Sequence, residues 1–195
     1  MKIYLIRHGQ TTGDVEDRYG GAYDDRLSDK GKSQVHELAN KIGNSGIQIL
    51  LCSPMMRAQE TAKILVSKLH CEIKIKENLK ERNKNGVLTG MKRSEAKTTY
   101  PELVQSLTDY RNQIQGAESH DDFVDRIRKV FKEIVAAVDY VSIGVVTHGG
   151  PMWVVLKDIL NVGITDIADC AYAVINIEGQ KLSLEKSEGI EYQNT

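Results

Sequence analysis

Two short apolar segments of this chain each run directly into a histidine that is followed by glycine. Residues 3–6 lead into Arg7 and His8, and the apolar run 141–146 leads through a threonine into His148. Runs of this length and composition are typical of buried strands. Open α/β sheets bind ligands beyond the C-terminal ends of their strands. We therefore expect both imidazoles and the Arg7 guanidinium at one ligand-binding edge of a sheet.

Apolar strands and helical patterns alternate along the chain, with more than ten residues between successive apolar strands until a late hairpin. We expect strands at 3–6, 47–52, 73–75, 141–147, 172–177 and 181–184, and helices beginning at Ser28 and near Pro54, one after Pro101, and others over 121–138 and 152–160. Such alternation predicts a mainly parallel sheet with helices on both faces. The hairpin makes the sheet mixed, so the predicted fold class is a three-layer α/β/α architecture.

Size and charge limit the remaining possibilities. The 195 residues are 41% hydrophobic and show no linker, which predicts one domain over 1–195. There are 26 basic and 27 acidic residues, so the net charge of −1 favours neither nucleic acid nor an anionic membrane as a partner. An RNA-binding domain would also need a basic stripe with interleaved aromatic residues, which is missing.

Three cysteines and the absence of long apolar runs suggest a cytoplasmic location. Cys52, Cys71 and Cys170 are odd in number and widely spaced, which argues against a disulfide framework or a zinc site. The N-terminus reaches Arg7 and His8 before a signal-like apolar core forms, and no run of about 18 apolar residues occurs. We expect no metal and no cofactor.

A further arginine belongs to the predicted edge. Arg57 falls about one turn inside the helix that begins near Pro54, so it could face the same crevice as Arg7, His8 and His148. Arginine offers forked donors that match phosphoryl oxygens. Nearby guanidinium groups lower the pKa of an imidazole from about 6.5 and favour its neutral, nucleophilic form. The sequence therefore predicts a phosphate site with His8 as nucleophile. The alternative is structural: an arginine paired with a carboxylate and a histidine that caps a strand.

Two polar segments lie between these elements. Residues 10–26 have no helical or strand period and leave directly from His8, so we interpret them as a binding loop, with a merely flexible connection as the alternative. Residues 77–93 are punctuated by glycine and rich in cations, and most such segments are solvated loops.

Several blocks of the sequence together suggest a family. They are Arg7-His8-Gly9-Gln10-Thr11, Leu27-Ser28 with Gly31, Ser53-Pro54 through Arg57-Ala58 with Thr61-Ala62, Leu79 with Glu81, and Thr147-His148-Gly149. In this order and spacing they resemble the phosphoglycerate-mutase-like branch of the histidine phosphatase superfamily, over residues 2 to about 150. The resemblance implies that branch's α/β/α fold and a reaction that needs no metal.

The resemblance also implies roles for individual residues. His8 would attack the phosphoryl group to give a phosphohistidine, which water then hydrolyses. Glu81 matches the family's acid, which protonates the leaving oxygen and later activates water. The alternative for Glu81 is one more carboxylate in a charged loop. The phosphate-binding positions would be Arg7, Arg57, His148 and Gly149.

The first loop departs from the family pattern at three positions. Gln10 stands where the family usually has Glu, Asp14 where it often has Asn, and Gly20 where it often has Gln. An aspartate near a phosphate dianion is unfavourable unless it turns away, pairs with an arginine such as Arg18, or is protonated. We still count Asp14 and Gly20, with Thr11, among the candidate substrate-binding positions.

The resemblance leaves the reaction type open. We favour a phosphomonoester hydrolase acting on a small phosphorylated metabolite. A phosphoglycerate mutase-type phosphotransferase is the alternative, because Glu81-Arg82-Asn83 is similar to the mutase acid motif, although the mutases' longer basic insertion is missing. A non-catalytic sensor of phosphate esters is a further alternative. Arg82, Lys92 and Arg93, with Lys84, are candidates for a lid that recognises a second anionic group. The terminal hairpin and the helix 152–160 could form the interface of a homodimer.

Overall fold

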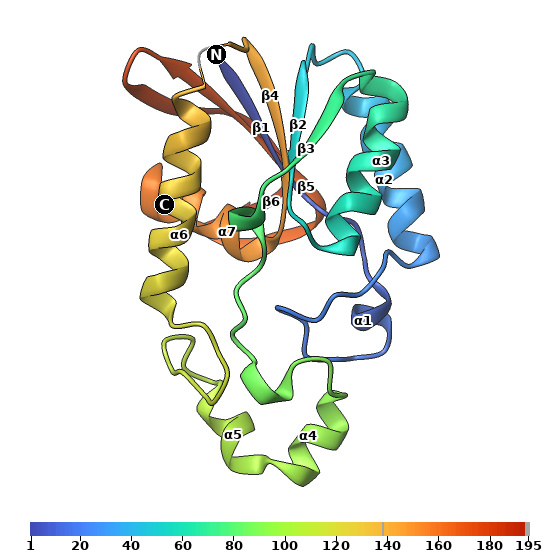
Figure 1. Cartoon of the computed structure of the whole chain (residues 1–195), viewed down its shortest axis with the longest axis vertical. Helices are drawn as coiled ribbons and strands as arrows, with labels where there is room; N and C mark the ends of the chain where they lie inside the picture. The colour runs from blue at the N-terminus through green and yellow to red at the C-terminus, as the bar shows by residue number, and fades with distance from the viewer. Residues whose placement is uncertain (138, 194–195) are drawn as a thin grey trace.

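The fold is built on one six-stranded sheet, drawn in Figure 1 from a computed structural model that describes residues 1–137 and 139–193. The strands are β1 (Lys2–Arg7), β2 (Ile49–Cys52), β3 (Glu72–Ile75), β4 (Ser142–Thr147), β5 (Ile164–Glu178) and β6 (Lys181–Tyr192), in the spatial order β3-β2-β4-β1-β5-β6. The first four are parallel, whereas β5 is antiparallel to β1 and β6 is antiparallel to β5. The predicted mainly parallel, mixed sheet is confirmed.

The register of the two central strands brings the two histidines together. β1 and β4 are parallel neighbours, and Arg7 lies opposite Thr147 at their C-terminal ends. The next residue in each strand is therefore a histidine, His8 in one and His148 in the other. The adjacent imidazoles expected from the sequence thus follow directly from the strand pairing.

Helices cover both faces of the sheet, as Figure 1 shows. On one face lie α2 (Asp29–Ile42) and α3 (Met56–Leu69), and on the other lie α6 (His120–Val135), α7 (Gly149–Trp153) and the π-helical turn η3 (Val154–Ile159). Successive side chains of β1 point to opposite faces of the sheet. Leu5 packs with α6 and α7 on one face, and Ile6 packs with α2 and α3 on the other. This is the three-layer architecture predicted from the sequence.

Local signals explain where the helices begin. The Ser28 side chain accepts a hydrogen bond from the Gly31 N–H at 3.0 Å, which caps α2 at the predicted position. Ser119 caps α6 in the same way through the Asp122 N–H. α6 ends at Val135, so the described helix is shorter than the predicted 121–138, and Val138 lies outside the described residues.

The region between β3 and α6 contains more structure than predicted. It holds the 3₁₀ turns η1 (Glu77–Leu79) and η2 (Gly86–Leu88) and the helices α4 (Arg93–Thr99) and α5 (Pro101–Ser106). The α4–α5 segment lies beyond the C-terminal edge of the sheet in Figure 1 and packs on its own small core of Tyr19, Leu88, Ala96 and Ile114. α4 was not predicted, because it is a short, polar helix in which only Ala96 is buried.

The late hairpin and the first loop also differ from the prediction. β5 begins at Ile164 rather than at 172, because register shifts between Ile167 and Tyr172 interrupt the alternation that marks a strand. β6 extends to Tyr192. The loop 10–26 contains one helical turn, α1 (Thr12–Val15), and is otherwise irregular as expected.

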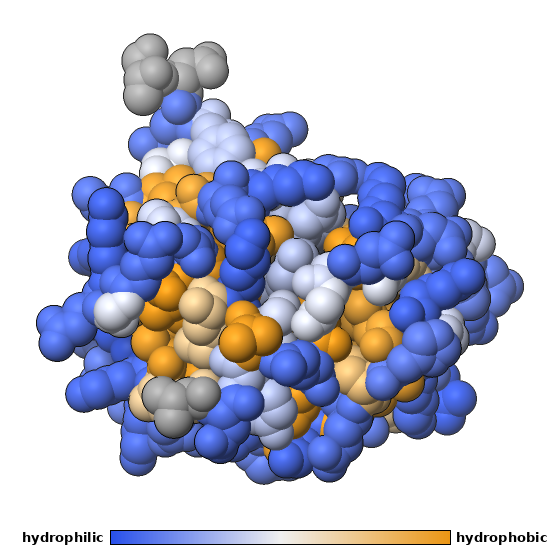
Figure 2. Space-filling view, turned by 90° about the horizontal axis from the view of Figure 1, so that it is seen from above, coloured by the Kyte–Doolittle hydropathy of each residue, from blue (hydrophilic) through white to orange (hydrophobic). Residues whose placement is uncertain are grey.

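The end of the molecule opposite α4 and α5 offers few large apolar areas. Figure 2 looks onto the end of the molecule opposite α4 and α5, where hydrophilic residues dominate and hydrophobic residues form separated patches. Of the helices in the described ranges, none combines the length and the apolar character needed to cross a bilayer.

Candidate active site

Arg57 lies between the two histidines at the C-terminal edge of the sheet. Its Nε–H points at Nε2 of His8, 3.1 Å away, and at Nδ1 of His148, 3.2 Å away. The two imidazole rings are 5.0 Å apart between centroids. All three side chains are buried, with 6% or less of their surface exposed. The predicted constellation is therefore present in space.

These contacts determine which nitrogen of each imidazole carries a proton. Because Arg57 can only donate, Nε2 of His8 and Nδ1 of His148 are acceptors. The opposite nitrogens then donate: Nδ1 of His8 to the Gly9 carbonyl at 2.8 Å, and Nε2 of His148 to Ser53 Oγ at 2.7 Å. His8 thus carries a lone pair on Nε2, on the side of the guanidinium.

Both imidazoles are held in the neutral form. Burial lowers the pKa of His8 well below its ordinary value, and the positive charges of Arg57 and Arg7 lower it further. Burial and Arg57 also lower the pKa of His148 well below the ordinary value. A neutral imidazole keeps one unprotonated nitrogen, here Nε2 of His8, and such a nitrogen is a competent nucleophile.

The Arg57 guanidinium also ties the first loop to the site. NH1 donates to the Tyr23 carbonyl at 2.6 Å and to the Asp25 carboxylate at 2.9 Å, and NH2 donates to the Gly21 carbonyl at 2.9 Å. The Arg57–Asp25 ion pair has both side chains only 5% exposed. The loop is therefore ordered around the arginine, which supports the interpretation of a binding loop over that of a flexible connection.

Arg7 is fixed from the other side, by the irregular part of β5. Its guanidinium donates to the Ile167 carbonyl and pairs with Asp169 at 3.2 Å. Burial raises the pKa of Asp169, and the charge of Arg7 opposes that rise. The Nε of Arg7 is buried and finds no partner within residues 1–137 and 139–193. An unused donor on a permanent cation is suited to an anionic ligand.

Glu81 approaches the site from the segment that follows η1. One carboxylate oxygen accepts from the Gly150 N–H at 2.9 Å and the other from the Arg82 N–H at 2.7 Å. A Cβ atom on Gly150 would lie 2.1 Å from the Glu81 carboxylate, so glycine is required for this approach. The carboxylate is thus anchored at the start of α7, two residues after His148.

One cavity of about 250 Å³ collects most of the predicted residues. It is lined by Arg7, His8, Thr11, Gly13, Asp14, Gly20, Gly21, Asp25, Arg57, Glu81, Gly149, Trp153, Asp166 and Ile167. His148 is fully buried and reaches the site through Arg57. The arrangement combines a neutral imidazole, the Glu81 carboxylate and two guanidinium groups around one cavity.

Comparison with known protein families finds a match that covers nearly the whole chain. Residues 3–188 match the histidine phosphatase superfamily, branch 1. The chain belongs to that superfamily. The resemblance seen in the sequence is therefore confirmed over nearly the whole chain.

Relatives within the superfamily include named phosphatases. The chain is 26% identical over 188 residues to phosphoserine phosphatase 1 of Hydrogenobacter thermophilus, covering 93% of this chain and 89% of that protein. It is 30% identical over 154 residues to phosphoglycerate mutase-like protein 4 of Arabidopsis thaliana, covering 76% and 66% of the two chains. The crystal structure of the α-ribazole phosphatase from Shigella flexneri superposes with a TM-score of 0.83 at 22% identity, covering 95% of each chain. The prediction of a phosphatase-type enzyme is confirmed.

The departures from the histidine phosphatase pattern have local explanations. Gln10 turns away from the cavity and accepts a hydrogen bond from the Ser28 hydroxyl at 2.9 Å. Asp14 lines the cavity but neither turns away nor pairs with Arg18, because its carboxylate accepts from the Thr11 N–H and hydroxyl in a capping box. Gly20 has open space where a side chain would stand. Thr11 thus anchors Asp14 as well as lining the cavity.

Three predicted cations do not line the cavity. Arg82 is 6% exposed, and its guanidinium donates to the Glu118 and Tyr110 carbonyls. Arg93 pairs with Asp17 at 3.2 Å and lies over the Tyr19 ring. Lys92 is exposed at the start of α4. The structure therefore uses two of these residues to hold the α4–α5 segment and its flanking loops together, because Arg82 Nε and NH1 donate to backbone carbonyls and Arg93 Nε pairs with Asp17.

Several residues that shape the site carry no clear signal in the sequence. Asp25 lies in the irregular first loop, Asp166 lies near the start of β5 before the predicted strand 172–177, and Trp153 lies in the predicted helix 152–160. Gly150 directly follows the His-Gly pair, so the Gly-Gly sequence itself was the available signal. Within the described parts of the chain, no group of three or more His, Cys, Asp or Glu side chains is placed to hold a metal ion.

Proposed function

We propose that the chain is a phosphomonoester hydrolase that uses His8 as nucleophile and needs no metal ion. The observation that carries the proposal is the neutral His8, whose Nε2 lone pair lies 3.1 Å from the Arg57 Nε in the cavity lined by Glu81. Simple phosphate binding needs neither a nucleophile nor an acid. Their presence in one cavity therefore favours an enzyme over a sensor.

In the first step, Nε2 of His8 attacks phosphorus and the bond from phosphorus to the alcohol oxygen breaks. Arg7, through its unused Nε–H, and Arg57 stabilise the negative charge on the phosphoryl oxygens, and Gly149 lines the same cavity. His148 accepts from the same Arg57 Nε–H as His8 and helps to hold the guanidinium in place. Glu81, in its acid form, gives its proton to the departing oxygen.

In the second step, water attacks the phosphohistidine and the P–N bond breaks. Glu81, now a carboxylate, accepts the proton of that water, so the same group serves in both directions. Inorganic phosphate leaves and His8 returns to its neutral form. The hydrogen bond from His8 Nδ1 to the Gly9 carbonyl stabilises the positive charge that the ring carries in the intermediate.

A hydrolase fits the site better than a mutase. A mutase must hold a product with its own charged group while the phosphoryl group returns, which calls for further cations in a closed site. Arg82, Lys92 and Arg93 do not line the cavity, whereas Asp14 and Asp166 do. The proposed substrate is therefore a small phosphorylated metabolite whose ester is hydrolysed.

The test is phosphate release from p-nitrophenyl phosphate and a panel of metabolite phosphates, with and without EDTA. We expect EDTA-insensitive release by the wild type and a loss of at least about 10³-fold in His8→Ala, since the nucleophile is gone. The matched control is His36→Ala, which removes an exposed histidine of α2 and should leave the rate unchanged. Mass spectrometry after rapid quenching should find one phosphoryl group on His8. Release that survives in His8→Ala contradicts the proposal.

A further inference from the structure

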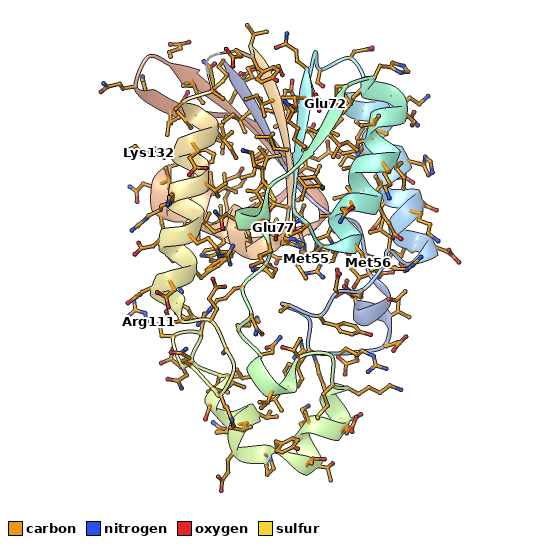
Figure 3. All side chains as sticks on the ribbon, in the orientation of Figure 1. Met55, Met56, Glu72, Glu77, Arg111 and Lys132 are labelled. Atoms are coloured by element: carbon orange, nitrogen blue, oxygen red, sulfur yellow. The ribbon has the colours of Figure 1, made fainter. Side chains whose placement is uncertain are left out.

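A second, larger hollow adjoins the phosphate cavity at Glu81. This groove has a volume of about 640 Å³, against about 250 Å³ for the cavity, and Glu81 lines both. It is lined by Ala22, Asp24, Pro54, Met55, Lys80, Glu81, Asn83, Gly116, Ala117 and Glu118. Figure 3 places Met55 at the end of the sheet that faces the α4–α5 segment. An alcohol leaving from a phosphoryl group at His8 and protonated by Glu81 would lie in this groove.

Small and apolar side chains make up much of the groove wall. Ala22 comes from the first loop, Pro54 and Met55 from the start of α3, and Ala117 from the loop before α6. Met55 is 8% exposed, and its sulfur contacts the Arg57 guanidinium at 3.4 Å. A thioether held in place in this way offers a favourable contact to an aromatic ring.

Most polar side chains of the groove already have hydrogen-bond or ion-pair partners within the protein. The Asn83 amide donates to the Gly116 carbonyl at 2.8 Å and accepts from the Thr89 hydroxyl at 3.0 Å. Glu118 makes a two-pronged pair with Arg126, at 2.8 and 2.9 Å. Hydrogen bonds to a ligand therefore have few available partners among these side chains.

The charges of the groove do not suit a second anion. Lys80 is the cation in its lining, against the carboxylates of Asp24, Glu81 and Glu118. Asp24 accepts from the Met56 N–H at 2.7 Å, which fixes a carboxylate in the groove wall. Because Arg126 balances Glu118, a carboxylate or second phosphate on the alcohol would meet the fixed charge of Asp24, with Lys80 as the cation of the lining.

We propose that this groove binds the alcohol portion of the substrate, and that this alcohol is uncharged, has an aromatic or similar apolar part, and is larger than a three-carbon acid. The inference rests on the proposed hydrolase, because it needs the phosphoryl group at His8. The groove lies within the range of about 300–1,000 Å³ typical of pockets for organic ligands. A three-carbon acid would leave most of it empty and would place its carboxylate among carboxylates.

The experiment compares three primary alkyl esters whose alcohols are similarly poor leaving groups: ethyl phosphate, 2-phenylethyl phosphate and 3-phosphoglycerate. We expect kcat/KM for the phenylethyl ester to exceed that for each of the others by at least about tenfold, as apolar contacts of this size give in enzyme pockets. The inference is overturned if 3-phosphoglycerate is the best substrate or if the phenyl group brings no gain.

Substitutions in the groove wall test whether the preference for the phenylethyl ester arises in the groove. Ala22→Trp fills the groove from an exposed position outside the phosphate cavity, and Ala117→Phe fills it from the loop before α6. Each should lower kcat/KM for the phenylethyl ester at least about tenfold more than kcat/KM for ethyl phosphate, whose alcohol is much smaller. Val141→Trp, at a 71% exposed residue just before β4, is the control and should change neither ester. Equal losses on both esters in the Ala22 and Ala117 variants overturn the inference.

A binding measurement separates this inference from the proposed function. If the wild type hydrolyses none of the esters, the hydrolase proposal fails. Calorimetry with the non-hydrolysable 2-phenylethylphosphonate and ethylphosphonate then still tests the groove. A Kd at least about tenfold lower for the phenylethyl compound supports the groove assignment, and equal Kd values overturn it.

Discussion

Gly150 and Glu81 meet at the point where α7 begins: the Gly150 N–H donates to a Glu81 carboxylate oxygen at 2.9 Å, and no room remains for a side chain on the glycine. The contact links the segment after η1 to the residue two positions after His148. A single backbone donor thus determines where the candidate acid stands relative to the histidine pair. Three predictions follow from this relationship and from the charges around it, each with its own measurement.

Gly150→Ala should displace the acid while leaving the nucleophile in place. The new Cβ would lie 2.1 Å from the Glu81 carboxylate, which must move, and general acid catalysis contributes about 10²–10⁴-fold to a rate. We expect kcat/KM for ethyl phosphate, which reports the step that breaks the P–O bond, to fall at least about tenfold. kcat/KM for p-nitrophenyl phosphate should fall much less, because its leaving group departs without protonation.

The matched control for that variant is Gly149→Ala. A Cβ at Gly149 has its nearest neighbour, the Arg7 Nε, at 3.8 Å, an ordinary contact distance. It should leave the ratio of the two substrates unchanged. The measurement is kcat/KM of both variants for ethyl phosphate and p-nitrophenyl phosphate. An equal loss of kcat/KM on both esters in Gly150→Ala argues against a role of Gly150 in positioning Glu81.

Asp25→Ala should destabilise the fold much more than the loss of a surface charge does. Asp25 pairs with buried Arg57 at 2.9 Å and also accepts from the Gly13 N–H at 3.0 Å. Removing one partner of a buried ion pair costs about 3–5 kcal/mol of unfolding free energy, because the remaining charge stays buried. Urea denaturation measures the change.

Glu185→Ala provides the comparison for Asp25→Ala. Glu185 pairs with Lys2 at 2.7 Å, but both side chains are more than 40% exposed. Solvent screens an exposed pair, so its removal should hardly move the urea midpoint. Similar losses in the two variants would show that the Arg57–Asp25 pair does not organise the first loop.

Stability should fall as the pH drops below about 6.5, the pKa of an unfolded histidine. The folded pKa of His8 and of His148 is well below that value because of burial and the charge of Arg57. Below about pH 6.5 the unfolded chain therefore binds protons that the folded chain does not, and each such proton costs up to about 1.4 kcal/mol per pH unit. Urea unfolding from about pH 7.5 to about pH 5 should show this slope.

Two variants test which histidines cause the loss of stability at low pH. His8→Gln and His148→Gln should each remove part of the pH dependence, since each deletes one buried imidazole. His36→Gln, which changes an exposed histidine, should leave the dependence unchanged. A wild-type protein that is equally stable across this range would contradict the neutral assignment of both histidines.

Much of this molecule could be predicted because its strongest signals are local. β1 and β4 are continuous apolar runs, and His8 and His148 follow them without an intervening loop. Ser28 and Pro54 mark helix starts that depend on their own neighbours in the chain. The α4–α5 segment carries no such signal, because its few apolar residues bury themselves against Tyr19 and Leu88 from distant parts of the chain.

The cationic segment shows the limit of reading charge from sequence. Arg82 and Arg93 looked equivalent as members of a basic loop, yet Arg82 is buried against backbone carbonyls whereas Arg93 stays exposed beside Asp17. A charged side chain follows whichever partners the fold brings near, and those partners lie far away along the chain. Composition therefore predicted cations near the site but not their directions.

The sequence by itself determined the order of strands and helices and the arrival of His8, Arg57 and His148 at one edge, since strand ends and first helical turns follow from short-range patterns. Only the tertiary structure decided which nitrogen of each histidine holds its proton, that Asp25 anchors Arg57, and that a larger groove adjoins the cavity at Glu81. The physical reason is that these properties depend on hydrogen bonds, burial and charge between residues that are distant in sequence and become neighbours only when the sheet and its loops assemble.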